Sequence, residues 1–427
     1  MHDSSGTQAG GRNRTSDGWL KMAENIAVVG TGLIGSTLVC ALQQALPKAN
    51  IIWVGGENPQ PNPKQGQDSR VIACSLSSKK LFEDLGVWGE LADERMGCYQ
   101  RMKVWDYEGT GQVDFSAEEL VSSGSSNSDN FLGYIVENAI LLEAIERRIE
   151  NSSAQPDRHI PAKVEAIEQL DTGAVLLRLD TGSEIEVDLL LAADGAKSFV
   201  RDWAGLSARR WSCKQRALTA VVTHSNSNQQ TAWQAFLPTG PLAFLPLAEQ
   251  SGTFQSSIVW SVDFAAVEEI EQLDDAEFLH RLSRYMPAEL GSPLSVTPRF
   301  GFDLQQSLAA NYYSDRVVLV GDSAHNIHPL AGQGANLGFA DIAELIAQLK
   351  RADSRGESLW SDSVKRRYQR QRRWQNQSMA MAMDVFREGF GIEEPHIRVL
   401  RNQLMHLFQD QIGLKKMFAK VASGASK

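Results

Sequence analysis

A glycine-rich turn, GTGLIG at Gly30 to Gly35, constrains the fold more than any other feature of the sequence. The apolar run Asn25 to Val29 predicts a buried strand before it, and the spacing of apolar residues from Leu33 to Leu46 predicts a helix after it. A second strand follows at Ile51 to Val54. This order is typical of a dinucleotide-binding βαβ unit, because glycines let the backbone approach a pyrophosphate that the helix N-terminus attracts. The residues expected to contact such a cofactor are Gly30, Gly32, Leu33, Ile34 and Gly35.

The turn alone does not separate NAD from FAD, and an ordinary strand-to-helix turn is the alternative. An acidic residue that binds the ribose hydroxyls is expected at the end of the second strand. Here Val54 is followed by Gly55 and Gly56. Glu57 is therefore the nearest candidate for the ribose, and a solvated loop carboxylate is an equal alternative.

The remaining pattern predicts two kinds of sheet. Helices are expected at Ser77 to Leu85, ending at Gly86, and at Val136 to Ile149. Residues from Ala217 to Val262 are mostly strand-like with Pro and Gly punctuation, which favours a separate antiparallel sheet. The buried-strand pattern resumes at 317–320, a helix is expected at 336–349, and the chain from about 361 is mainly helical.

We therefore predict an α/β protein with a discontinuous Rossmann-like cofactor domain, an inserted antiparallel-sheet substrate domain and a helical C-terminal region. The polar N-terminus is excluded from the fold, and Met22 is an alternative start. The expected segments are a disordered tail at 1–23; the cofactor domain at 24–95, 135–205 and 299–360; the substrate domain at 96–134 and 206–298; and C-terminal helices at 361–427.

Composition narrows the class of partner. The formal charge of −10 disfavours nucleic acid, which is bound mainly by clustered Lys and Arg, so a small molecule is expected. The four cysteines form no CxxC pair. His325 and His328 are three residues apart but lie in a loop without a third ligand in view, so no metal site is expected. Without a signal-peptide pattern or a membrane-spanning run, the expected location is cytoplasmic.

The most specific stretch is GDSAHNIHPLAGQGANLG, Gly321 to Gly338. It resembles the second flavin motif of the class A FAD-dependent aromatic monooxygenases, and its HPLAGQG core resembles their ubiquinone-biosynthesis hydroxylase branch. Three other stretches agree in family order, and the resemblance covers roughly residues 24 to 405. These stretches are DSRVIACSLSSKKLFEDLGVW at 68–88, LGYIVEN at 132–138 and LLLAADGAKSFVR at 189–201.

Site residues follow partly from physics and partly from this resemblance. Asp322, leaving a strand, can accept hydrogen bonds from ribityl hydroxyls. Amides near Gly334, at a helix N-terminus, can stabilise the negative charge of reduced flavin. The resemblance implies that Arg70 reaches the phosphates and that Asp194 belongs to a motif associated with FAD and NAD(P)H; surface ion pairs are the alternative for both. Further expected cofactor contacts are Val164, Gly195, Gly321, Pro329, Gly332, Ala335 and Asn336.

No catalytic base is identified. A flavin-facing loop is expected to contact the isoalloxazine and the substrate, through His328, Pro329, Leu330 and Gly332. The resemblance implies FAD as cofactor, NAD(P)H as electron donor and O2 as cosubstrate. It implies ring hydroxylation of a polyprenylated phenol or quinol, most similar to the enzyme acting on 2-polyprenyl-3-methyl-6-methoxy-1,4-benzoquinol. The alternatives are a sister enzyme acting at another ring position and a non-catalytic flavin-binding subunit of a quinone-synthesis complex.

The basic run KRRYQRQRRW, Lys365 to Trp374, precedes a helical tail with apolar Ile397, Leu400, Leu404, Leu407 and Phe408. This pattern is consistent with docking on the inner face of the cytoplasmic membrane or with contacts to other quinone-biosynthesis proteins. A helix packed against its own protein is the alternative. Oligomeric state is not indicated by the sequence.

Overall fold

A six-stranded sheet carries the glycine-rich turn in the computed structural model, which describes residues 24–57, 70–91, 95–120, 130–249, 252–327, 333–391, 394–411, 413 and 415. The strand order is β19-β20-β12-β1-β2-β8, and all pairs are parallel except β19 with β20. The strands are β1 Asn25–Val29, β2 Asn50–Val54, β8 Asp157–His159, β12 Leu189–Ala192, β19 Tyr313–Ser314 and β20 Val317–Leu319. The predicted tail at 1–23 lies outside the described residues.

Helices pack around this sheet, which explains why its central strands are continuous apolar runs. Helix α1 packs against α4 and α8, and α8 also packs against α2 and the long helix α9. An edge-to-face contact between Phe82 and Phe339, with ring centroids 4.9 Å apart, joins α2 to α8. The helices are α1 Leu33–Ala45, α2 Leu76–Asp84, α4 Asn138–Glu150, α8 Gln333–Ser354 and α9 Asp362–Gly391.

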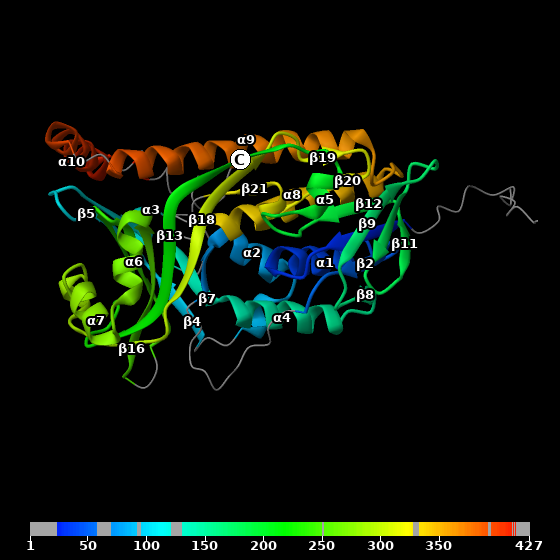
Figure 1. Ribbon diagram of the computed structural model, residues 1–427. Helices are drawn as coiled ribbons and strands as arrows, with labels where there is room; N and C mark the ends of the chain where they lie inside the picture. The colour runs from blue at the N-terminus through cyan, green and yellow to red at the C-terminus, as the bar shows by residue number, and fades with distance from the viewer. Residues whose placement is uncertain are drawn as a thin grey trace, which may run out of the picture.

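A nine-stranded sheet forms the second large unit (Figure 1). Its strands are antiparallel except that β14 runs parallel to β5. The helices α6 Phe264–Gln272 and α7 Asp275–Ser283 pack on it around the buried Trp260. The strands are β5 Arg101–Asp106, β6 Gln112–Ser116, β13 Ala208–His224, β14 Thr231–Leu237, β15 Gly240–Pro246, β16 Phe254–Asp263, β17 Pro293–Val296, β18 Phe300–Ala309 and β21 His325–Asn326.

Two three-stranded sheets and three further helices complete the described chain. One sheet has the order β3-β7-β4 and the other β11-β10-β9. Figure 1 shows α9 running along one side of the molecule, with α10 beyond its end. These elements are β3 Val71–Ser75, β4 Met96–Tyr99, β7 Gly133–Glu137, β9 Val164–Gln169, β10 Val175–Leu179, β11 Glu184–Val187, α3 Ala117–Leu120, α5 Phe199–Trp203 and α10 Pro395–Asp410.

The predicted fold class is confirmed, with two local differences. The predicted helix at 136–149 starts too early, because 133–137 is the fully buried strand β7 between β3 and β4, and the helix begins at Asn138. Strand β18, assigned from sequence to the cofactor domain, pairs with β13 in the nine-stranded sheet. The domain boundaries otherwise stay a prediction. No described helix is long and apolar enough to cross a bilayer.

Candidate cofactor site

The glycine-rich turn joins β1 to α1, and each glycine has a different environment. Gly30 has φ of +124°, and a Cβ there would lie 2.2 Å from the carbonyl oxygen of Ala193 after β12. A Cβ on Gly35 would lie 2.0 Å from the carbonyl oxygen of Gly30. A Cβ on Gly32 would meet nothing within 4 Å. Two glycines therefore permit close packing, and the third leaves an open approach to the helix N-terminus.

Helix α1 offers its first amides without a competing side chain. Its N-cap is Gly32, which makes no side-chain cap hydrogen bond, and the first turn has no acidic residue. Leu33 and Ile34 occupy that turn and are half-buried. An uncapped helix N-terminus is a suitable place for a phosphate group.

Glu57 and Val164 lie on segments near this turn, and Arg70 precedes β3 of the β3-β7-β4 sheet. The loop after β2 is held close to the turn because the Thr31 hydroxyl donates to the Gly56 carbonyl oxygen at 2.7 Å. Glu57 follows and is exposed; Arg70 is exposed just before β3. Val164 begins β9 and is half-buried. The structure thus places Glu57 at the carboxyl edge of the sheet; the ribose contact of Glu57 and the phosphate contact of Arg70 stay predictions.

Asp194 and Gly195 follow β12, which pairs directly with β1. Asp194 is half-buried: its Oδ2 accepts from the Val200 amide at 3.2 Å, whereas its buried Oδ1 has no partner among the described residues. Burial raises the pKa of Asp194, and hydrogen bonds from Ser198 and nearby amides oppose that rise. Gly195 has φ of +83° and open space where a Cβ would be. This segment therefore presents an unsatisfied polar atom beside the glycine turn.

The second predicted loop leaves β20 at Gly321 and meets the first one. Gly321 has φ of +64°, and a Cβ there would lie 2.9 Å from Cγ2 of Ile34. Asp322 is accessible to solvent, yet the surrounding protein atoms desolvate its carboxylate and raise its pKa; His325 lowers the pKa and Asp341 raises it. Asp322 thus directly follows a residue that lies against the N-terminal turn of α1.

Helix α8 begins at Gln333, and its first turn contains Gly334, Ala335 and Asn336. A Cβ on Gly334 would meet nothing within 4 Å, so there is free space at this position of the first turn. The Asn336 side chain is buried and engaged: Oδ1 accepts from the Ser75 amide at 2.9 Å and Nδ2 donates to the Ala73 carbonyl oxygen at 2.7 Å. Its side chain therefore ties α8 to β3. His328, Pro329, Leu330 and Gly332 lie outside the described residues.

Sequence reasoning missed a buried polar cluster beneath the second loop. Asp341 in α8 accepts from His325 Nε2 at 2.5 Å and from Arg372 Nε at 2.7 Å, and all three side chains are buried. The His325 side chain points into this cluster, which is consistent with a role in shaping the loop. The available signal was Asp341 among the apolar residues of the helical stretch FADIAELIAQL, which has one other acidic residue, Glu344.

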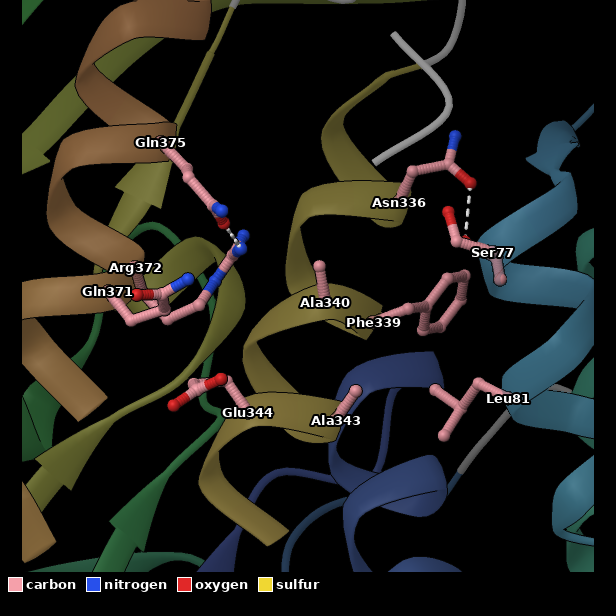
Figure 2. Close-up of a pocket in the computed structure, with 11 residues that line it drawn as sticks. Ser77, Leu81, Asn336, Phe339, Ala340, Ala343, Glu344, Gln371, Arg372 and Gln375 are labelled. Atoms are coloured by element: carbon pink, nitrogen blue, oxygen red, sulfur yellow. Dashed lines mark hydrogen bonds between the residues drawn. The ribbon is translucent and has the colours of Figure 1, made fainter. Parts of the chain in front are cut away.

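A small pocket lies beside this cluster and includes Asn336 (Figure 2). Figure 2 shows Arg372 and Gln375 of α9 on one side of α8, and Ser77 and Leu81 of α2 on the other. Its volume is about 240 Å³, below the 300 to 1,000 Å³ usual for ligand pockets. It is too small for a dinucleotide, so the candidate cofactor site is the sheet edge and not this pocket.

The candidate site fits an extended dinucleotide. The segments that contain Gly30, Asp194 and Gly321 follow β1, β12 and β20, which are adjacent parallel strands, so all three lie at the carboxyl edge of one sheet. Ligands of open α/β sheets bind at this edge. Among the described residues, the uncapped start of α1 and the unpartnered Asp194 Oδ1 are what such a cofactor would cover. Fold and site together define an α/β dinucleotide-binding protein.

Comparisons with known proteins specify the class. The family described as FAD binding domain matches residues 141–380. The 3-demethoxyubiquinol 3-hydroxylase of Escherichia coli (strain K12) is 34% identical over 404 residues, covering 93% of this chain and 98% of that enzyme. The mitochondrial ubiquinone biosynthesis monooxygenase COQ6 of Mus musculus is 30% identical over 425 residues, covering 88% and 86%.

Among solved structures, p-nitrophenol 4-monooxygenase PnpA from Pseudomonas putida DLL-E4 superposes with a TM-score of 0.73 at 18% identity, covering 95% of this chain and 99% of that one, which supports the fold. The chain belongs to the class A FAD-dependent monooxygenases, in the branch of the ubiquinone-biosynthesis hydroxylases. The family predicted from sequence is confirmed. FAD is its cofactor, with NAD(P)H and O2 as cosubstrates typical of the class.

Proposed function

We propose that this enzyme hydroxylates the ring of 2-polyprenyl-3-methyl-6-methoxy-1,4-benzoquinol, a precursor of ubiquinone. The observation that carries the proposal is the nearly full-length similarity to the E. coli 3-demethoxyubiquinol 3-hydroxylase. The internal motifs LGYIVEN at 132–138 and FLPTGPLAFLPL at 236–247 support the same branch. Sister enzymes acting at other ring positions are the second candidate, favoured by the 30% identity to COQ6.

The proposed cofactor placement uses the open features of the site. The α1 amides beyond Gly32 would hold the pyrophosphate, aided by Arg70, and Glu57 would accept from the ribose hydroxyls. Asp322 would accept from the ribityl hydroxyls, and the first turn of α8 at Gly334 would face the flavin ring. When bound, FAD supplies the oxygen activation. The protein supplies binding, orientation and exclusion of water.

An apolar cluster would provide the dry wall for the substrate ring. It joins the nine-stranded sheet, the second loop and the C-terminal helix α9, and it consists of the buried Phe236, Ile327, Leu337, Met379, Ala380 and Met383. Phe236 stacks on Phe390 with ring centroids 3.7 Å apart. Because these residues come from both large units, the ring would be held between the sheet and the flavin loop, away from bulk water.

The activity is tested with purified, flavin-loaded protein and short-chain quinol analogues. We expect substrate-dependent NAD(P)H oxidation, oxygen consumption and a product heavier by one oxygen atom with the 3-methyl-6-methoxy benzoquinol. A 2-polyprenylphenol analogue should react much more slowly. Reaction with the phenol alone would assign a sister activity. Flavin-loaded protein that consumes no NAD(P)H above background with any of the analogues would support the non-catalytic subunit.

Peripheral membrane contact is the finer part of the proposal, and the structure changes where we place it. Half of the six basic residues in the predicted run are tied into the protein: Lys365 and Arg372 are buried, and Arg367 donates to Gln348 at 2.7 Å. Helix α10 instead exposes four apolar side chains, Val399, Leu400, Leu404 and Leu407, each 55% to 61% exposed. An amphipathic helix with an outward apolar face suits a lipid surface.

Vesicle flotation tests this contact. We expect the double variant Leu400→Ser with Leu404→Ser to float less than wild type on both neutral and anionic vesicles, because insertion would be apolar. Leu294→Ser, at an equally exposed leucine on β17, is the matched control and should float like wild type. A wild-type dimer in lipid-free solution that the double variant dissociates would instead make this face a subunit interface.

A further inference from the structure

Asp341 is the most highly connected buried carboxylate near the proposed cofactor site. It lies in α8, is fully buried, and accepts four hydrogen bonds. Its Oδ2 accepts from the Gly321 amide at 3.0 Å and from His325 Nε2 at 2.5 Å. Its Oδ1 accepts from Arg372 Nε at 2.7 Å and from Asn376 Nδ2 at 3.2 Å. Neither oxygen is therefore left for a ligand.

The two oxygens bind different parts of the chain. Oδ2 holds the second cofactor loop at two points on either side of Asp322, since Gly321 precedes that residue and His325 follows it. Oδ1 holds α9 through Arg372 and Asn376. One carboxylate thus connects the loop to α9, a helix that has no proposed contact with FAD here.

The charge of the carboxylate matters for this connection. Burial alone would raise the pKa of Asp341, but His325 and Arg372 outweigh that effect and hold the pKa well below its usual range. The group is therefore an anion at neutral pH. Hydrogen bonds to a charged acceptor are roughly twice as strong as neutral ones, so the anion favours a single loop position.

The surroundings of Arg372 indicate that α9 is fixed in turn. Its guanidinium also donates to the Leu337 carbonyl oxygen at 3.3 Å and to Asn376 Oδ1 at 2.8 Å, and it contacts Gln375. Asn376 Nδ2 donates to the Tyr312 hydroxyl at 3.2 Å. The fork of one arginine therefore joins α8 and α9, and a lysine could not reproduce that geometry.

We infer that Asp341 is a positioning residue for FAD, holding Asp322 in its cofactor-binding place, and that Arg372 on α9 acts through it. The inference rests on the proposed placement of FAD beside Asp322. Asp341→Asn removes the charge. The core should stay packed, because asparagine has nearly the same shape as aspartate. The loop should move, because the asparagine NH2 group would face two hydrogen-bond donors in place of an acceptor.

The experiment measures FAD binding to deflavinated full-length protein by flavin fluorescence, together with the unfolding temperature without FAD. Asp341→Asn should bind FAD about tenfold or more weakly, the size expected when a hydrogen bond to a charged group is lost. Arg372→Lys should weaken binding in the same direction and by less. Binding of free FAD is the readout, so the result does not depend on turnover.

Asp106→Asn is the matched control. Asp106 is also a buried carboxylate that holds a C-terminal helix, accepting from Arg401 Nε at 3.0 Å and Asn402 Nδ2 at 3.0 Å, but it lies on β5. The variant Asp106→Asn should lower the unfolding temperature without changing FAD affinity by more than about twofold, since distant sites act independently. Equal losses of FAD affinity in Asp106→Asn and Asp341→Asn would reduce the role of Asp341 to general stability.

Asp322→Ala separates this inference from the proposed site. If Asp322→Ala weakens FAD binding while Asp341→Asn and Arg372→Lys do not, the positioning role is wrong and the site stands. If Asp322→Ala also binds FAD normally, the proposed placement itself is wrong. Should Asp341→Asn fail to fold, Arg372→Lys decides: normal FAD affinity in that variant overturns the inference.

Discussion

Ile34 lies against the backbone of Gly321, so that the first cofactor loop and the second are in direct contact. A Cβ on residue 321 would lie 2.9 Å from Ile34 Cγ2 and 3.1 Å from Ile34 Cγ1. The same isoleucine also limits Gly338, where a Cβ would lie 2.5 Å from Ile34 Cδ1. Glycine is therefore required at 321 for two reasons: its backbone is left-handed, and Ile34 fills the space that a side chain would need.

This contact predicts that Gly321→Ala weakens both stability and FAD binding. Gly182→Ala is the control, because Gly182 also has a left-handed φ, +83°, but open space around it. The backbone cost, about 1 kcal/mol, should be shared, whereas only Gly321→Ala displaces Ile34. Adding Ile34→Ala should restore part of the FAD affinity of Gly321→Ala. Thermal unfolding and FAD titration measure both effects, and equal behaviour of the two alanine variants would contradict the contact.

Gly32→Ala should separate folding from cofactor binding. Gly32 has φ of −65° and no atom near its Cβ position, so alanine fits the protein without strain. We expect an unfolding temperature without FAD close to that of wild type and FAD affinity at least about tenfold lower, because the methyl group would occupy the pyrophosphate approach. Gly35→Ala should instead destabilise the protein without FAD. Full flavin occupancy in Gly32→Ala would move the pyrophosphate elsewhere.

Asp322 should be costly for stability and necessary for the cofactor. Its pKa is raised above the ordinary 3.8, chiefly by desolvation, so its ionisation destabilises the folded state. This cost is absent below the unfolded pKa, grows as the pH rises from the unfolded to the folded pKa, and stays constant above it. We expect deflavinated Asp322→Asn to unfold at a higher temperature than deflavinated wild type at pH 7, with the difference vanishing as the pH approaches 3.8.

The same variant should hold little flavin, measured as the absorbance ratio of flavin to protein after gel filtration. Asp322→Ala should be folded and flavin-poor as well. A protein with full yellow colour in either variant would show that Asp322 is not the ribityl contact. If deflavinated Asp322→Asn were more stable than wild type at low pH and not at pH 7, the assigned cause of the pKa shift would be wrong.

Arg70 gives a prediction about ionic strength. If it contacts the cofactor phosphates, Arg70→Ala should weaken FAD binding several-fold at low salt, and the difference from wild type should shrink as salt is added. Arg209→Ala, at another exposed arginine on β13, should leave FAD binding unchanged at every salt concentration. FAD titrations over a salt series measure this, and a salt-independent loss would indicate a structural role.

The sequence predicts the βαβ unit well because its local signals agree with its tertiary role. Strand β1 has its predicted limits, and Gly86 adopts the left-handed φ, +73°, expected after α2. Strand β7 was missed because GYIVE is too short to separate from the helix that follows, and only pairing with β3 and β4 makes it a strand.

The site is predictable as far as its backbone is concerned. Gly30 and Gly321 are specified by left-handed φ angles that glycine adopts readily. The direction of polar side chains is less accessible to sequence, because it depends on partners far along the chain. Asn336 turns toward Ala73, and His325 turns toward Asp341 and not toward solvent. Similarly, the basic run that begins at Lys365 has the pattern of a solvated helix face. In the structure, however, the buried Lys365 side chain donates to the carbonyl oxygen of Asp315.

The position of β12 between β1 and β20 has a consequence for how the protein is made. Gly30 is synthesised early, but the strands that complete this part of the sheet, β12 at 189–192 and β20 at 317–319, are synthesised much later. Pairings between such distant segments form slowly. A nascent chain would therefore carry an incomplete nucleotide fold for much of translation, and flavin could be captured only after β20 has been made.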